Sequence, residues 1–131
     1  MQTALIWAAR LALLVVLVVC ASGALDPQHD VNRSVPPPDV VEHVMYGYLL
    51  TLLSLASLPR VNPWLIGGAY LLAGVGFETA QVFRLVAGNF EWKDMAANVV
   101  GVAAALAPFA LARARSAKVD PGFAIRTRSR S

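Results

Sequence analysis

Apolar residues in this chain fall into four long runs, separated by polar connectors. A helix crosses the hydrocarbon core of a bilayer with about 20 apolar residues, in a range of roughly 17 to 25. The runs match that length, or nearly so, and predict membrane-spanning helices at Ala4 to Ala24, Val40 to Leu58, Trp64 to Val86 and Met95 to Ala112. The pattern therefore predicts an all-α integral membrane four-helix bundle.

The connectors carry residues that end helices. The first reads DPQHDVNRSVPPPD and closes with three prolines, the second is the short turn PRVNP, and the third, AGNFEWKD, holds Gly, Asn and an interfacial Trp92. We divide the chain into a first helix at 1–24, an external connector at 25–38, a three-helix core at 39–112 and a tail at 113–131. The tail is polar and basic, and we expect it to be disordered.

Composition supports a membrane protein. Hydrophobic residues make up 57% of the chain, charged residues 15%, and the mean hydropathy is +0.58, which is too apolar for an ordinary soluble domain of 131 residues. The sequence pI of about 9.5 comes from the tail, since six of the 11 basic residues lie there. The rest of the chain has more acidic than basic groups, so we predict no nucleic-acid partner. The lone Cys20 excludes an intrachain disulfide and a multi-cysteine metal site.

The first apolar run has two interpretations. Arg10, followed by LALLVVLVVC and ASGA, has the charge, apolar core and small residues of a secretory signal. The additional apolar residues ALIWAA before Arg10 favour an uncleaved membrane anchor. Cleavage would leave a bundle of three helices in the same orientation.

Basic residues predict the orientation, because cytoplasmic loops of membrane proteins are enriched in Lys and Arg. The basic tail and Arg60 in the second connector favour the cytoplasm. Arg84 and Lys93 lie on the opposite side and are a minor conflict. With four spans, both termini are cytoplasmic, and the first and third connectors face outward.

Polar residues within the apolar runs gather at the predicted outer ends of the helices. A rise of 1.5 Å per residue places them within roughly 12 Å of the outer boundary. In chain order they are Asp39, Glu42, His43, Glu78, Gln81, Asp94 and Asn98. The inner halves carry almost no polar residues, which disfavours transport across the membrane.

Helical spacing places these residues in three stripes, one on each core helix. The stripes are Asp39, His43, Tyr46 and Leu50; then Gly74, Glu78 and Gln81; then Asp94, Asn98, Gly101 and Ala105. Ionisable groups that face lipid cost about 2.5 to 3.5 kcal/mol at the bilayer centre, so we expect the stripes to face one another. The small residues Gly74, Gly101 and Ala105 would allow the helices to approach closely. Glu78 should then point into a polar cavity that opens outward.

Several of these residues also have a purely structural interpretation. The segment DVVE is a capping box, in which Asp39 caps the helix and Glu42 reaches back to it. Asp94 could likewise serve as a helix cap. Gln81 and Asn98 could hydrogen-bond between helices. These alternatives remain open at the level of sequence.

Three segments resemble the motif blocks of the VanZ-like family of small bacterial membrane proteins. DVVEHVMYGYLL has an acidic residue and a histidine opening a helix, GFETAQVF has E-x-x-Q, and FEWKDMAANVVGVAAA has D-x-x-x-N-x-x-G. The resemblance covers Asp39 to Ala112. Val40 stands where a lysine often follows the first aspartate, and Gly88 and Asn89 where an arginine usually stands.

The resemblance implies a small bacterial membrane protein whose motif residues are Asp39, His43, Glu78, Gln81, Asp94, Asn98 and Gly101. We expect a multi-pass protein of the inner membrane, and the basic residues predict that its polar site faces outward. The family takes its name from a protein associated with resistance to the glycopeptide antibiotic teicoplanin, so it implies a role in the cell envelope rather than a defined activity. The candidate site residues are Asp39, His43, Tyr46, Glu78, Gln81, Asp94 and Asn98.

Two classes of function remain open. In the first, which we favour, the site binds the head group of an envelope lipid or a lipid-linked cell-wall precursor. In the second, an outer-leaflet enzyme uses His43 with Glu78 or Asp94 as general acid and base on a lipid-linked phosphate or ester. Zinc or manganese would suit these side chains. However, the set has only one histidine and its members lie on separate helices, which is a weak signal for a metal site, so we predict neither a metal nor another cofactor. Membrane lipids are the expected partners, and no protein partner can be named.

Overall fold

The computed structural model describes residues 2–24, 38–86 and 89–119, with side chains omitted at 23–24, 38–39 and 117–119. Within these ranges the chain is all-helical and contains no strand. The helices are α1 (Gln2–Ala24), α2 (Pro38–Ser57), α3 (Pro63–Val82) and α4 (Trp92–Val119). Each is long and apolar enough to cross a membrane, which confirms the four predicted apolar helices.

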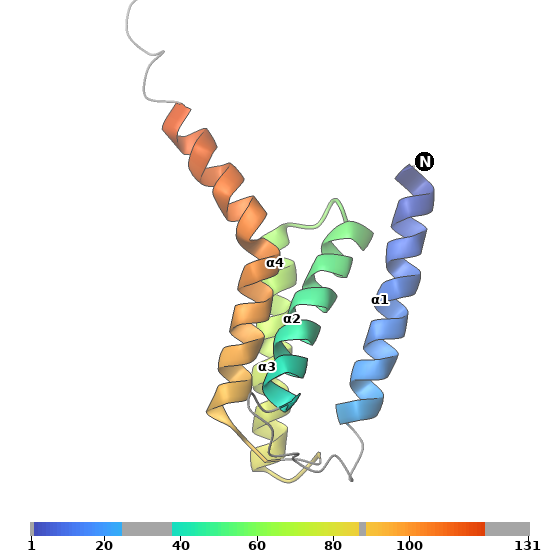
Figure 1. The fold of residues 1–131 in the computed structure, drawn as a ribbon, viewed down its shortest axis with the longest axis vertical. Coiled ribbons are helices and arrows are strands. Elements are labelled where there is room, and N and C mark those ends of the chain that lie inside the picture. The colour runs from blue at the N-terminus through green and yellow to red at the C-terminus, as the bar shows by residue number, and fades with distance from the viewer. Residues whose placement is uncertain (1, 25–37, 87–88, 120–131) are drawn as a thin grey trace, which may run out of the picture.

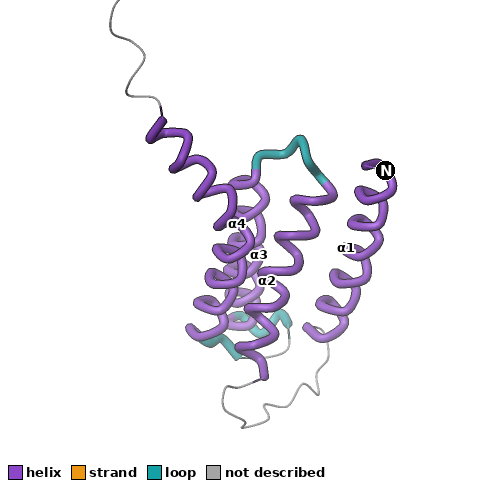
Figure 2. Tube along the Cα trace, turned by 45° about the horizontal axis from the view of Figure 1, so that its top comes forward, coloured by secondary structure: helices purple, strands orange, loops and turns teal. Residues whose placement is uncertain are grey.

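The helices run up and down, and α2, α3 and α4 form the core of the bundle (Figure 1). The most extensive contact joins α2 and α4, whereas α3 packs against both of them. Among the described residues, α1 contacts α2 alone and lies at the side of the bundle (Figure 2). This alternation brings the start of α2, the end of α3 and the start of α4 to one end of the molecule (Figure 1).

Two glycines lie where α2 and α4 approach most closely. A Cβ atom on Gly101 would collide with the carbonyl oxygen of Val44 and lie 2.8 Å from the backbone nitrogen of Tyr48. A Cβ atom on Gly47 would lie 3.1 Å from the carbonyl oxygen of Asn98. The two backbones therefore touch directly, and neither glycine can gain a side chain without moving a helix.

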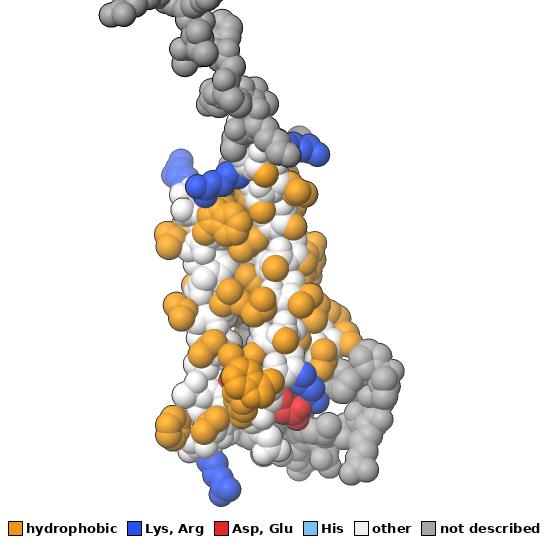
Figure 3. Space-filling view, turned by 90° about the vertical axis from the view of Figure 1, so that its left-hand side faces the viewer, with side chains coloured by type: hydrophobic (Ala, Val, Ile, Leu, Met, Phe, Trp, Pro, Cys, Tyr) orange, Lys and Arg blue, Asp and Glu red, His pale blue; other side chains and the backbone are white. Residues whose placement is uncertain are grey.

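Most of the large apolar side chains lie on the outside of the bundle. In Figure 3 they run along the length of one face, with Lys and Arg side chains near its two ends. The small buried apolar set consists of Leu50, Ile66, Ala97, Val102, Ala105 and Leu106. The apolar window of α1 has no buried residue at all. A surface of this kind is suited to lipid hydrocarbon and would be costly in water.

The ends of α3 have local causes. Asn62 caps its start, since its Oδ1 accepts a hydrogen bond of 3.0 Å from the backbone N–H of Trp64, with Pro63 in the first turn. At the other end Arg84 adopts a left-handed conformation with φ of 56°. The backbone N–H of Leu85 donates to Ala80 at 2.9 Å, as in a Schellman motif. Helix α3 thus ends at Val82 rather than at the predicted Val86.

Helix α4 is longer than predicted at both ends. It begins at Trp92 and continues through Pro108 to Val119, so 113–119 is helical where an unstructured tail was expected. The stretch LARARSAK explains the continuation, because Leu, Ala, Arg and Lys are strong helix formers. At about 1.5 Å per residue, 28 residues exceed a hydrocarbon core of about 30 Å, so the last turns project beyond it. Residues 120–131 of the expected tail lie outside the described residues.

The contact of α2 with α4 makes a testable prediction. Gly101→Ala should destabilise the bundle by about 1 to 3 kcal/mol, because the added methyl group meets backbone atoms that cannot turn away. The measurement is thermal unfolding in detergent. Gly76→Ala is the matched control: a Cβ atom there meets nothing within 4 Å, and the helix should gain about 0.5 to 1 kcal/mol. Equal melting temperatures for the two variants would contradict this description of the contact.

Candidate functional site

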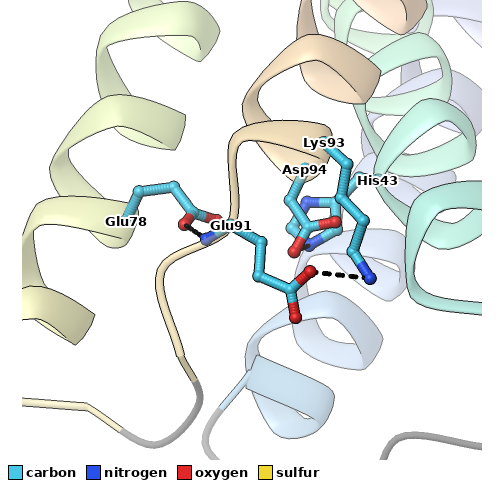
Figure 4. A network of polar contacts seen from close by, with 5 residues as sticks. All are labelled: His43, Glu78, Glu91, Lys93 and Asp94. Carbon is cyan, nitrogen blue, oxygen red and sulfur yellow. Dashed lines mark hydrogen bonds and ion pairs between the residues drawn. The ribbon is translucent and has the colours of Figure 1, made fainter.

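Three ionisable side chains from three helices meet at one end of the bundle. His43 lies near the start of α2, Glu78 near the end of α3 and Asp94 in the first turn of α4 (Figure 4). One nitrogen or oxygen from each lies within 4.8 Å of the other two. His43 Nε2 and Asp94 Oδ2 are 3.7 Å apart. We call His43, Glu78 and Asp94 the triad.

Burial differs within the triad. Glu78 is 2% exposed and Asp94 is 7% exposed, whereas the His43 side chain is 30% exposed. Glu78 is thus covered, and does not line the open cavity that the sequence suggested. His43 is the most exposed member of the triad. Two ionised carboxylates this close repel each other in a low-dielectric site, so a proton or a cation must offset their charge.

The connector between α3 and α4 contacts Glu78 through Glu91. The backbone N–H of Glu91 donates to Glu78 Oε2 at 3.2 Å (Figure 4). The Glu91 carboxylate turns away from Glu78 and pairs with Lys93 Nζ at 2.7 Å. An edge-to-face contact of Phe90 with Trp92, with ring centroids 5.1 Å apart, also holds this segment. The connector therefore supplies a backbone donor that orients Glu78.

Sequence reasoning missed this role of Glu91. The donor is a backbone group, present in almost every residue type, and only the path of the connector brings it to α3. Glu91 itself offered the weak signal of an acidic residue directly before a helix. Its side chain is about a third exposed and lies against Lys93, outside the triad.

Asn98 lies one helical turn from Asp94, where α4 meets both neighbours. A Cβ atom on Gly74 of α3 would lie 3.1 Å from Asn98 Nδ2, so the amide packs directly on that glycine. The main chain of Asn98 faces Gly47 of α2. Gln81 is half-buried near the end of α3. This arrangement suits the predicted role of Asn98 in joining helices.

Two predicted site residues, Tyr46 and Asp39, are not members of the triad. Tyr46 lies one turn from Glu42 and interacts electrostatically with that carboxylate and with Cys20 of α1. It is therefore near the side of α2 that carries α1. The backbone of Asp39 belongs to α2, but its side chain lies outside the described residues, as does any capping box it would form.

Away from the triad, α2 is more polar than the sequence pattern predicted. Thr51, Ser54 and Ser57 follow one another at intervals of three along α2, and all are buried. Ser54 Oγ and the hydroxyl of Tyr70 on α3 share a hydrogen bond of 2.7 Å, and Ser57 Oγ donates to the carbonyl of Leu53 at 2.6 Å. The spacing was visible in the sequence but was overlooked because these small hydroxyls are common in apolar helices. They carry no charge, and Ser54 links α2 to α3 through Tyr70.

Comparisons with known proteins find no match: no family model, no curated protein and no solved structure matches this chain. The VanZ-like resemblance therefore rests on the motif residues alone.

Near-isosteric substitutions test whether the triad is a functional site or a structural brace. Glu78→Gln, His43→Asn and Asp94→Asn remove charge and proton transfer but keep most hydrogen-bonding capacity. Each should abolish ligand retention while lowering stability by less than about 1 kcal/mol. The measurements are co-purifying lipid and thermal unfolding in detergent.

Asn98→Ala is the control for this series, because its amide packs against Gly74 of α3 and we expect it to join the two helices. It should lower stability by about 0.6 to 1.7 kcal/mol, more than Glu78→Gln does. Normal ligand retention in all three triad variants would show that these side chains only hold the helices together.

Proposed function

We propose that this chain is a VanZ-like integral membrane protein of the bacterial cell envelope whose triad binds the polar head group of an envelope lipid or a lipid-linked cell-wall precursor. The observation that carries the proposal is the meeting of His43, Glu78 and Asp94 at one end of an otherwise apolar bundle. Ionisable side chains within membrane helices are costly and are usually retained for function.

The position of the triad favours a head group over a wholly aqueous ligand. The site lies near the helix ends, at the depth where lipid head groups meet the hydrocarbon. Lipid tails would lie against the apolar outer surface, which includes Leu72 at 75% exposure. His43 can donate a hydrogen bond to a phosphate or hydroxyl oxygen, and the carboxylates can accept from hydroxyl or amine groups.

The basic residues support an outward-facing triad. Arg60 lies in the connector of α2 with α3, and Arg113 and Arg115 lie in the last turns of α4, all exposed. These segments share the end of the molecule opposite the triad (Figure 1). Under the positive-inside rule, that end faces the cytoplasm, with both termini.

Enzymatic activity is the second candidate, and the pairing of His43 with Asp94 favours it. An imidazole between two carboxylates can serve in general acid and base catalysis, and His43 Nε2 lies 3.7 Å from Asp94 Oδ2. The triad contains no serine or cysteine, so water would act as the nucleophile on a lipid-linked phosphate or ester. The same geometry supports binding of a head group without any assumed reaction, so we propose binding first.

Reporter fusions test the orientation. A reporter placed in the connector at 25–38 should be active only outside the cytoplasm, and one placed after Ser116 only inside it, because basic residues are retained on the cytoplasmic side. The measurement is the activity of paired reporters that work on opposite sides of the membrane. The reverse pattern would place the triad at the cytoplasmic face and remove the envelope proposal.

Lipid mass spectrometry tests the function itself. The wild-type protein purified in mild detergent should retain a lipid, and His43→Asn should lose most of it, since it alters the most exposed member of the triad. Leu111→Ala is the control, because it shortens an exposed side chain at the end of α4 opposite the triad and should leave retention unchanged. Conversion of added phospholipid by the wild type would favour the enzyme. Equal lipid content in wild type and His43→Asn would contradict head-group binding at this site.

A further inference from the structure

We infer that the triad is a binding site for a divalent cation, with zinc and manganese as the best-matched ions. The inference rests on the proposed function and deepens it, because the cation would be the group that recognises the phosphate of a lipid head group. Three observations carry it: the donor set, the charge balance and the support of Glu78 by the connector.

The donor set consists of one imidazole nitrogen and two carboxylate oxygens. These are ligands that zinc and manganese accept, and three protein ligands leave a position open for water or substrate. With metal-to-ligand distances of about 2.0 to 2.2 Å, any two ligands on one ion lie within about 4.4 Å of each other. His43 Nε2 and Asp94 Oδ2, at 3.7 Å, already meet this condition. The widest separation, within 4.8 Å, requires only a small side-chain rotation.

The charges of the triad also favour a divalent cation. Glu78 and Asp94 are buried close together, and ionised they would carry two negative charges into a low-dielectric bundle. A protonated His43 offsets one charge, while a divalent cation offsets both. A bound divalent cation would therefore offset both carboxylate charges of the triad.

The connector supplies a feature that metal sites commonly have. Ligating carboxylates are usually held in place by hydrogen bonds from neighbouring groups. The backbone N–H of Glu91 makes such a bond to Glu78 Oε2 at 3.2 Å. This bond restrains the Glu78 carboxylate beside the other two side chains.

A cation also resolves a chemical conflict in the proposed function. Two carboxylates alone would repel the phosphate or diphosphate of a lipid head group. A divalent ion with an open coordination position would bind a phosphate oxygen directly, and the partly exposed side of the triad at His43 would admit it.

The test uses full-length protein in detergent, stripped with a chelator and titrated with zinc or manganese ion alone. We expect one ion per chain by elemental analysis and a higher melting temperature on loading. His43→Asn, Glu78→Gln and Asp94→Asn should each weaken binding by more than about 100-fold, beyond the effect typical of outer-shell changes. Glu91→Gln is the matched control: it removes a nearby carboxylate but keeps the backbone donor, and should bind within about tenfold of wild type.

Cobalt loading of the wild type keeps the test independent of how well the variants fold. An absorption spectrum with d–d bands of nitrogen and oxygen coordination supports the site. Failure of all three ions to bind stoichiometrically, or equal binding by the three triad variants, overturns the inference. If the metal-free protein still retains lipid, the metal site is wrong and the proposed function stands. If the protein binds metal but retains no lipid, the proposed function is wrong and the metal site stands.

Discussion

The direct contact of the α2 and α4 backbones is the constraint on which the site depends. Gly101 lies against Val44, the neighbour of His43, and no side chain intervenes. Asp94 lies two helical turns before Gly101 on α4, so the same contact sets the distance between Asp94 and His43. A larger residue at Gly101 would separate the helices and with them the two side chains.

The third member of the triad is positioned by a different means. Helix α3 packs less extensively than α2 and α4 pack against each other, and its residue Glu78 is held by the connector that follows it. The early end of α3 at Val82, with Arg84 in a left-handed conformation, lets the chain turn back over Glu78. The site thus combines a rigid glycine-mediated pair with a carboxylate restrained by a loop.

Charge and surface explain why such a site belongs at a membrane boundary. An apolar exterior gives the bundle no polar surface with which to stabilise buried charge, so Glu78 and Asp94 must be compensated locally. A proton from solvent, a cation or a charged head group can each do so near a helix end. The hydroxyl side chains of Thr51, Ser54 and Ser57, further along α2, are buried without charge and need no such compensation.

The sequence by itself determined the four apolar helices and the candidate site residues, because helix length and period are local properties of the chain. It also left two interpretations open for each of Asp94 and Asn98: a residue of the functional site, or a structural residue that caps a helix or joins two helices. The tertiary structure alone decided that His43, Glu78 and Asp94 converge, that Tyr46 lies near α1, and that Glu78 is covered rather than open. Helical period indicates which face of a helix is polar, but the distance between faces depends on how closely the backbones approach. That approach is set by contacts such as Gly101 with Val44 and by the path of the connector through Glu91, which join residues far apart in the chain.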